Sequence, residues 1–264
     1  MSMSIGLGIG IGKRRGGSSL PETRALVARM TTKPVAARAG LIDNLIKALK
    51  AAGVWSQLDA LYVMAAADAQ AAKLNWITGT YDLTAVSAPT FTVDRGYAGD
   101  GAASYLDTGF NPITAPSPKF TQNSGSLILW SRTNLPNGAD NSGDFGRENS
   151  RIGRFLSTSG MAMGRINMAS TLNSMAAGAY PGMISWSRTG SAAWTSYAAG
   201  VAVNSGTEAS AALTNGTLRI CSWTAGSFGV NQLAAAAIGA SLNGTQHAAV
   251  KAALQTYLTA IGAA

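Results

Sequence analysis

Apolar residues recur at helical spacing in the first third of the chain. Within residues 18–76, Leu41, Leu45 and Leu49 stand four residues apart, and Gly53 ends this run. The segment that follows, VWSQLDALYVMAAADAQAAKLNW, continues with widely spaced large side chains in an alanine-rich background. We therefore expect residues 18–76 to be helical and to pack on whatever follows them.

From about Tyr81 the pattern changes to short runs in which apolar and polar residues alternate. The runs include YDLTAVSAPTFTV, SGSLILWSRT, GMISWSRT and GTLRICSW, and Gly, Asn, Pro and Ser separate them. Asn-Gly pairs, which favour tight turns, stand at 137–138, 215–216 and 243–244. This spacing predicts an antiparallel β-sandwich. An amphipathic helix is expected at about 244–261.

The opening segment, SIGLGIGIGKRRGG, alternates glycine with aliphatic residues and then gathers three basic ones. A signal peptide has its charges before the apolar run, and a membrane-spanning helix needs about 20 apolar residues. The Walker pattern is not met either. We expect an extended arm that becomes ordered by adding a strand to a partner, although a flexible tail without a role is an alternative. The expected attachment residues are Ile5, Leu7, Ile9, Ile11, Lys13, Arg14 and Arg15.

Charge is sparse and unevenly placed. Only 12% of the 264 residues are charged, and the net charge is +8. Residues 1–40 hold seven basic residues against one acidic residue, whereas the other 224 hold thirteen against eleven. The basic start suits an acidic partner, and the charge-poor remainder suits a packed assembly better than a cytosolic enzyme. No nucleic-acid recognition motif occurs, so no nucleic-acid partner is expected.

The residue types needed for metal or acid–base chemistry are scarce. The single cysteine, Cys221, stands in an apolar run and is expected in the core, and the single histidine is His247. None of the three glutamates has an acidic neighbour two residues away, so the paired carboxylates of a glycosidase are not expected. Asp140, Asp144 and Glu148 share a glycine-containing segment that suits a solvated loop or, as an alternative, calcium. We expect no catalytic residue, metal or cofactor.

The string WSRT occurs at 130–133 and again at 186–189. In a strand, residues two apart share a face, so each copy would present tryptophan beside arginine. An aromatic ring with polar groups suits a sugar, although a sandwich also buries aromatic residues in its core. The possible glycan-binding residues are Trp130, Arg132, Trp186, Arg188 and Asp107. A second concentration of charge, suited to an acidic polysaccharide or an acidic neighbouring subunit, consists of Arg147, Arg151, Arg154 and Arg165.

Four segments carry a resemblance to a known group of proteins. They are GVWSQLDALYVMAAADAQAAKLNW, YDLTAVSAPTFTVDRGYAGDGAASYLDTGFNP, SGSLILWSRT and IGASLNGTQHAAVKAALQTYLTAIGA. Over about Arg24 to Ala264 the chain resembles bacteriophage and prophage virion proteins of the tail-fibre and minor-tail group. These carry a concanavalin A-like, or laminin G-like, jelly-roll domain. The resemblance implies a jelly roll with a helical lead-in, displayed on a virus particle.

Together these observations predict a mainly β protein, a concanavalin A-like jelly-roll sandwich of antiparallel sheets. The expected parts are an arm at 1–17, a helical lead-in at 18–78 and the sandwich with its C-terminal helix at 79–264. We expect a non-enzymatic protein of the virion surface that adheres to a host glycan at a tail fibre or tail tip. The alternatives are a head or tail decoration protein without a ligand and, less expected, a polysaccharide depolymerase. The expected partners are other virion proteins bound through the arm, further copies of the chain and a host-surface glycan, without membrane insertion.

Overall fold

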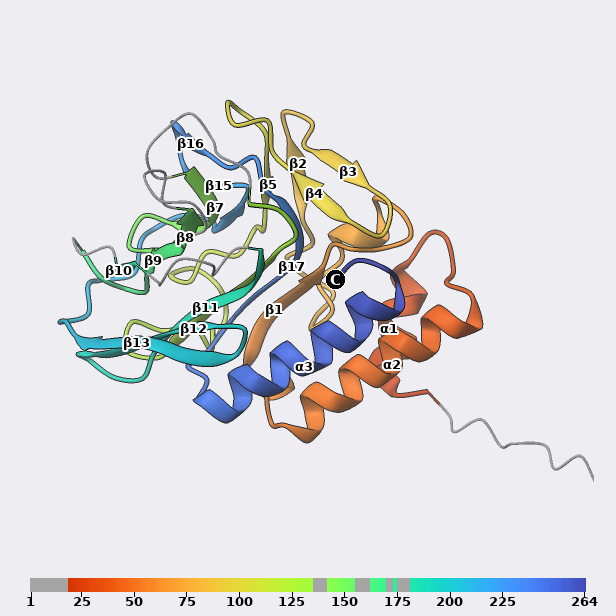
Figure 1. Ribbon diagram of the computed structural model, residues 1–264, viewed down its shortest axis with the longest axis horizontal. Coiled ribbons are helices and arrows are strands. Elements are labelled where there is room, and N and C mark those ends of the chain that lie inside the picture. Colours follow the sequence, from red (N-terminus) through yellow and green to blue (C-terminus); the bar gives the residue numbers. More distant parts are fainter. Residues whose placement is uncertain (1–18, 135–141, 155–161, 170–172, 175–180) are drawn as a thin grey trace, which may run out of the picture.

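The protein is a layered structure of helices and two β-sheets (Figure 1). Three α-helices form one outer layer, an eight-stranded sheet lies in the middle, and a seven-stranded sheet forms the opposite layer. The predicted mainly β sandwich of antiparallel sheets, with helices before it and after it, is confirmed. The predicted arm residues lie outside the described residues. This computed structural model describes residues 19–134, 142–154, 162–169, 173–174 and 181–264.

The middle sheet has the strand order β13-β12-β11-β6-β17-β4-β3, and β1 also pairs with β17. Its central strands are buried along their length, because one face packs on the helices and the other on the second sheet. Its strands are β1 Leu58–Val63, β3 Thr90–Thr92, β4 Gly96–Ala98, β6 Gly125–Ser131, β11 Gly182–Arg188, β12 Ala193–Ala198, β13 Val201–Thr207 and β17 Gln232–Gly239.

The outer sheet has the order β10-β9-β8-β7-β14-β5-β2. One of its faces packs on the middle sheet, and a small hairpin of β15 and β16 lies against β7. Its strands are β2 Thr84–Val86, β5 Tyr105–Asp107, β7 Ser142–Arg147, β8 Ser150–Arg154, β9 Ala162–Arg165, β10 Asn173–Ser174 and β14 Arg219–Ile220, and the hairpin consists of β15 Ser222–Thr224 and β16 Ser227–Phe228.

The helical layer consists of α1 Pro21–Arg29, α2 Ala36–Ala51 and α3 Gly244–Ala260. α3 begins with a capping box in which Asn243 and Gln246 satisfy each other's backbone N–H groups. The apolar residues of α2 that predicted a helix are buried, and α2 packs beside α3. Within the described residues, no helix has both the length and the apolar character needed to cross a bilayer.

The expectation that residues 54–76 continue the helical pattern is wrong. Two short 3₁₀ turns, η1 Trp55–Gln57 and η2 Ala71–Lys73, flank a strand, β1, which pairs antiparallel with β17. All six residues of β1 are buried. A short apolar run of this kind has the same local pattern in a buried strand and in a buried helix. Pairing with residues 235–239 of β17 makes this run a strand.

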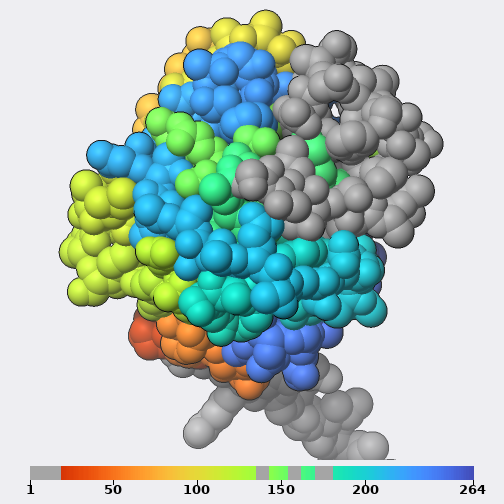
Figure 2. Space-filling model, turned by 90° about the vertical axis from the view of Figure 1, so that its left-hand side faces the viewer, coloured from red at the N-terminus to blue at the C-terminus, as the bar shows by residue number. Residues whose placement is uncertain are grey.

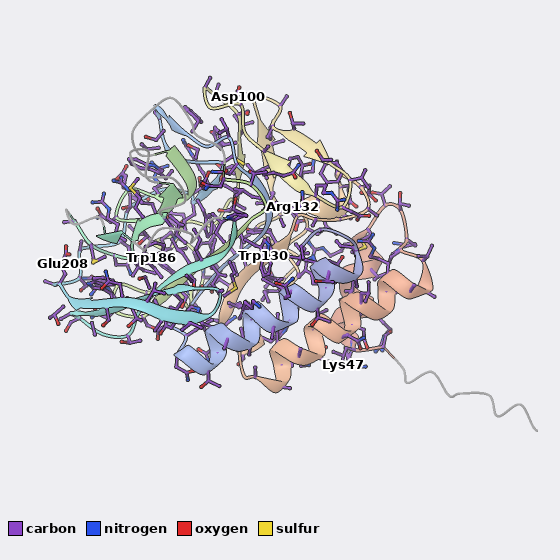
Figure 3. The ribbon with its side chains drawn as sticks, viewed as in Figure 1. Lys47, Asp100, Trp130, Arg132, Trp186 and Glu208 are labelled. Carbon is purple, nitrogen blue, oxygen red and sulfur yellow. The ribbon has the colours of Figure 1, made fainter. Side chains whose placement is uncertain are left out.

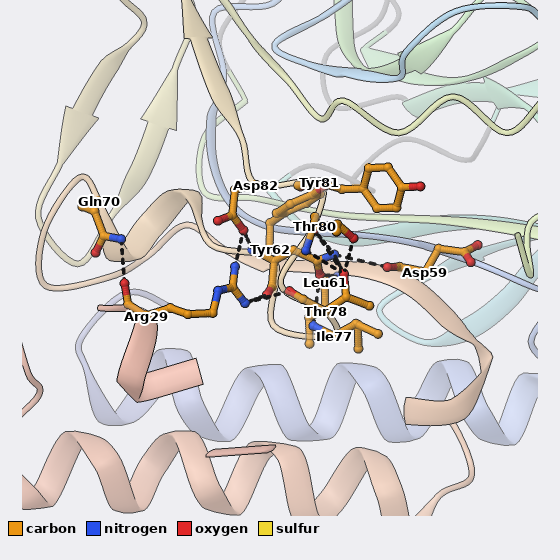
Figure 4. A network of polar contacts seen from close by, with 11 residues as sticks. Arg29, Asp59, Leu61, Tyr62, Gln70, Ile77, Thr78, Thr80, Tyr81 and Asp82 are labelled. Carbon is orange, nitrogen blue, oxygen red and sulfur yellow. Dashed lines mark hydrogen bonds and ion pairs between the residues drawn. The ribbon is translucent and has the colours of Figure 1, made fainter. Parts of the chain in front are cut away.

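The segment after β1 is held by the fully buried side chain of Asn75. Figure 4 shows the polar network around it, with Arg29, Asp59 and Leu61 among the labelled residues. Its Oδ1 accepts hydrogen bonds from the backbone N–H groups of Leu61 and Ile77, at 3.1 and 3.0 Å. Its Nδ2 donates to the Asp59 carbonyl at 3.2 Å. Arg29 of α1 donates to the Asn75 carbonyl at 2.8 Å, so this one segment ties the first helix to the middle sheet.

Candidate functional site

The two copies of WSRT lie on neighbouring strands, but their tryptophans point to opposite faces of the middle sheet. β6 and β11 pair antiparallel, with Trp130 opposite Met183 and Trp186 opposite Leu127. Trp186 faces the outer sheet, because a Cβ built on Gly164 of β9 would lie 2.8 Å from its ring. Trp130 differs from Leu127 by an odd number of positions, so it faces the helices.

Trp186 and Arg188 belong to the interior of the sandwich. Both residues are 0% exposed. The Arg188 guanidinium donates to backbone carbonyls, from Nε to Ile166 at 2.8 Å and from Nη1 to Glu208 at 3.1 Å. The structure therefore corrects the expected glycan-binding roles of Trp186 and Arg188, because neither side chain has a surface that a sugar can reach.

Trp130 and Arg132 line one cleft of about 320 Å³. Trp130 is 5% exposed, so only a small part of it borders the cleft. Figure 3 shows Trp130 and Arg132 near each other and Trp186 apart from them. The walls come from the end of β6, the start of β11, helix α3 and the last residues of the chain: Trp130, Ser131, Arg132, Pro181, Gly182, Gln255, Ala263 and Ala264.

The Arg132 guanidinium is fixed by two hydrogen bonds. Nε donates to the Ala263 carbonyl at 2.6 Å, and Nη1 donates to the side-chain oxygen of Gln232. These bonds use two of the five N–H donors of an arginine, which leaves further donors at the cleft. Burial, and then repulsion from Arg95, lowers the pKa of Arg132. An arginine nevertheless stays protonated, so a ligand oxygen with a partial or full negative charge would be attracted to this side of the cleft.

Asp107 lies in a different layer from this cleft. It belongs to β5 of the outer sheet, where its Oδ1 accepts from the Gly109 N–H at 2.8 Å. Its Oδ2 accepts from the Thr217 hydroxyl at 2.9 Å. The expected grouping of Asp107 with the two tryptophans is therefore corrected: this carboxylate stabilises a turn and a neighbouring loop of the outer sheet.

The other singled-out residues occupy structural positions. Cys221 is buried as predicted, and burial raises the pKa of its thiol. Asp144 is also buried and accepts from Asn231 at 3.1 Å, whereas Asp140 lies outside the described residues. Among the described residues, no group of three or more His, Cys, Asp or Glu could hold a metal ion.

Sequence reasoning missed the residues that complete the cleft. Gln255 comes from α3, and the carbonyl that orients Arg132 belongs to Ala263, 131 residues further along the chain. Gln232 approaches from β17. A local pattern of alternation carries no information about such contacts, because they depend on how β6, β17 and the chain end meet in space.

No family model matches the chain, and no curated protein matches it. A Trypanosoma rangeli sialidase in complex with sialic acid is similar in structure, with a TM-score of 0.54 and 9% identity over 83% of this chain and 39% of the sialidase. A mutant of that sialidase displaying trans-sialidase activity gives a TM-score of 0.51 and 8% identity over 85% and 40%. The chain thus spans about two fifths of either sialidase.

A third similar structure is domain 4 of a GH43 extracellular arabinanase from Geobacillus stearothermophilus, in complex with arabinotriose. Its TM-score is 0.49, with 14% identity over 74% of this chain and 98% of that domain. The two sialidase structures are the ones here with TM-scores above 0.5. At these identities the likeness establishes the β-sandwich fold.

Proposed function

We propose that this protein is a non-enzymatic carbohydrate-binding protein and that its glycan enters the cleft between Trp130 and Arg132. The observation that carries the proposal is the meeting of Trp130, the fixed Arg132 guanidinium and Gln255 in one cleft of about 320 Å³. Small-ligand sites are concave, with a few placed polar groups among apolar ones. A sandwich fold shared with part of a sialidase bound to sialic acid agrees with this assignment.

The cleft suits one sugar unit better than a long chain. The guanidinium N–H groups of Arg132 and the amide of Gln255 would donate to hydroxyl or carboxylate oxygens, and the exposed part of Trp130 would pack against the ring carbons. The two hydrogen bonds that hold Arg132 are made before any ligand arrives. Pre-positioned donors lower the entropy cost of binding.

We further propose that the protein is displayed on a bacteriophage particle and attached through residues 5–15 of its arm. The resemblance of the quoted segments and the excess of basic residues before residue 40 support this assignment. The described chain starts at Ser19, beside α1 on the helical side, so attachment there would leave the outer sheet free (Figure 1). Several copies on one particle would strengthen a weak sugar contact. A decoration protein without a ligand is the second candidate.

Glycan-array binding of the full chain tests the carbohydrate proposal. We expect the wild type to bind, and Arg132→Gln to weaken that binding roughly tenfold, since a hydrogen bond to a charged group contributes about 1.5 kcal/mol or more. Lys251→Gln on α3 removes one positive charge elsewhere and is the matched control. A wild type that binds no glycan, or an Arg132→Gln variant that binds as well as the control, would contradict the proposal.

Two further experiments test the other parts of this proposal. Deleting residues 1–17 should abolish incorporation into particles while the sandwich still melts cooperatively, and unchanged incorporation would rule out the arm as the attachment device. Incubation with the bound polysaccharide should release no new reducing ends. Their appearance would show a depolymerase instead.

A further inference from the structure

A row of charged side chains crosses the outer sheet. Arg165 of β9 pairs with Arg151 of β8, Arg151 pairs with Gly146 of β7, and Gly146 pairs with Arg219 of β14. The adjacent row is 0% exposed and faces the core; it contains Ile152, Phe145, Ile220 and Leu106. Because neighbours along a strand point to opposite faces, Arg165, Arg151 and Arg219 lie on the outward face, and we call them the arginine row.

Within the described part of the chain, the arginine row makes no ion pair, although Asp107 of β5 is the cross-strand partner of Arg219, and Glu148 and Glu208 act on Arg165 from farther away. Among the described residues, no carboxylate oxygen lies within 4.0 Å of any of the three guanidinium groups. Arg151 is only 8% exposed, and its Nε is a buried donor without an acceptor in the described structure. The Nε of Arg219 is likewise a buried donor without an acceptor in the described structure. A buried donor without a partner costs free energy that a bound anion would recover.

Two of the arginines are held flat against aromatic rings. The Cζ of Arg151 lies 3.6 Å from the centroid of Trp223, and that of Arg219 lies 4.4 Å from the centroid of Tyr105. Stacking uses the face of a guanidinium and leaves its N–H edge for an anion. Arg165 instead donates to the carbonyls of Glu148 and Ala169, both at 2.9 Å. Its main contribution to the row is therefore its positive charge, because part of its N–H groups is already used.

The position of Trp223 depends on a gap in the outer sheet. A Cβ on Gly143 of β7 would lie 2.1 Å from the Trp223 ring, so only glycine leaves room for the indole. The hairpin that carries Trp223 lies against β7, and Figure 2 shows it in blue above the green strands of the outer sheet. The aromatic support of Arg151 is therefore built into the fold.

We propose that the arginine row binds an acidic polysaccharide through its carboxylate or sulfate groups. Neighbouring strands lie about 4.8 Å apart, so Arg151 and Arg219, two strands apart, present donors roughly 10 Å from each other. Such a line of separated charges fits a chain with anionic groups at intervals. This surface belongs to a different sheet from the Trp130–Arg132 cleft, so it provides a second binding site.

The remaining surface favours a polysaccharide over other polyanions. The exposed large apolar residues of the described chain lie outside the strands of the outer sheet: Val35, Val93, Ile113, Val201 and Val203. The aromatic rings on this face, Trp223 and Tyr105, are half-buried and stacked on the arginines. Removing the three basic residues of the arm from the twenty in the chain leaves seventeen against twelve acidic ones. A net charge of +5 over this length is a weak field for nucleic acid.

Part of the predicted arginine cluster does not belong to the row. Arg147 follows Gly146 on β7 and so points to the opposite face, where it lines a small cavity with Phe120 and Leu218. The side chain of Arg154 lies outside the described structure. Arg219, which completes the row, is 54 residues beyond Arg165, and the strand pairing brings it there.

Binding of the full chain to immobilised alginate, a polymer of carboxylated sugars, tests this proposal. Neutral dextran, dextran sulfate, polyglutamate and single-stranded DNA are the comparison polymers. We expect Arg219→Gln to weaken alginate binding roughly tenfold, Arg219→Lys to weaken it less, and Lys251→Gln to leave it unchanged. Every variant keeps the basic arm, so the arm's own contribution cancels. Arg151→Gln should weaken alginate binding as Arg219→Gln does, provided that its thermal unfolding matches that of the wild type. If Arg151→Gln is destabilised, the test uses Arg219→Gln alone, because Arg219 is more exposed.

The outcomes separate this proposal from the carbohydrate-binding cleft. Tighter binding to alginate or dextran sulfate than to dextran, lost in Arg219→Gln and retained in Arg132→Gln, supports the arginine row. Equal alginate binding by Arg219→Gln and Lys251→Gln overturns it. Stronger binding to polyglutamate or DNA than to alginate also overturns it, in favour of an acidic protein or nucleic acid. Glycan-array binding that is lost in Arg132→Gln, together with no alginate binding by the wild type, would overturn the row and leave the cleft standing.

Discussion

The two copies of WSRT have the same four residues and opposite environments. In the first copy, Trp130 and Arg132 border a cleft, and the guanidinium is fixed by a carbonyl from the chain end. In the second copy, Trp186 and Arg188 are 0% exposed and hold the sandwich together. The difference follows from the pairing of β6 with β11, which places Trp186 opposite Leu127 and not opposite Trp130. An identical motif can therefore border a cleft in one strand and belong to the core in the next.

Truncating the tryptophans should separate the two copies most strongly. We expect Trp186→Ala to lower the free energy of unfolding by about 4 kcal/mol, because it leaves a cavity between the sheets. Trp130→Ala should cost about 1 kcal/mol less, since the cleft already gives this ring fewer neighbours. Urea unfolding measures both. An equal or larger loss in Trp130→Ala would contradict the claim that Trp130 borders an open cleft.

The two arginines give the next largest contrast. Arg188→Gln should destabilise the fold by about 3 kcal/mol, because the carbonyls of Ile166 and Glu208 lose a charged donor inside the sandwich. Arg132→Gln should cost about 1 kcal/mol, since water can replace the lost donor at the cleft. Chemical denaturation of the two variants checks this, and similar losses in both would contradict the assigned environments.

The strand of the second copy also predicts a pH effect. Ser185 of β11 lies 3.0 Å from Nδ1 of His247, and burial lowers the pKa of His247 to about 3. The unfolded chain, with a histidine pKa of about 6.5, then binds the extra proton first as the pH falls. Stability should therefore fall as the pH drops below 6.5, by roughly 2 kcal/mol at pH 5.

His247→Asn provides the control for this pH effect. Its stability should change little between pH 7 and 5, and the difference from the wild type should narrow as the pH falls. The window stays above pH 4.5, because Asp43, whose pKa is lowered to about 2, adds a further loss below its unfolded value of 3.8. Urea unfolding of the wild type and the variant at pH 7 and at pH 5 measures this. If both lose the same free energy of unfolding between the two pH values, the role of His247 is contradicted.

The serines of the two motifs should give the smallest difference. Ser187 donates to the carbonyl of Leu242 and accepts from its N–H, both at 3.0 Å, so it ties β11 to the chain before α3. Ser131 makes a local bond to the Thr133 carbonyl at 2.8 Å. We expect Ser187→Ala to cost about 1.5 kcal/mol and Ser131→Ala about 0.5 kcal/mol. Thermal melts of both variants and the wild type measure these losses. A larger loss of stability in Ser131→Ala than in Ser187→Ala would contradict the prediction.

The parts of the fold that sequence alone predicted are those fixed by local patterns. The spacing of Leu45 and Leu49 on α2 and the alternating runs of the sandwich are local signals. The Asn-Gly pair at 243–244, which suggested a tight turn, instead begins α3, with Asn243 as its N-cap. β1 was missed because both of its faces are buried, which removes the alternation that marks a strand. The two-residue spacing along a strand predicted that each WSRT copy presents tryptophan and arginine on one face. Only the pairing of β6 with β11 shows that the second copy faces the interior of the sandwich.

The most direct test of the account is hydrogen–deuterium exchange of the full chain with and without a saturating glycan ligand. We expect the glycan to slow exchange at the end of β6, around Arg132, and near Gln255 of α3, because these segments line the cleft. Segments around Trp186 should keep the exchange rates of the free protein. Protection absent from the cleft, or confined to β13 or the outer sheet, would contradict the claim that the Trp130–Arg132 cleft is the carbohydrate site.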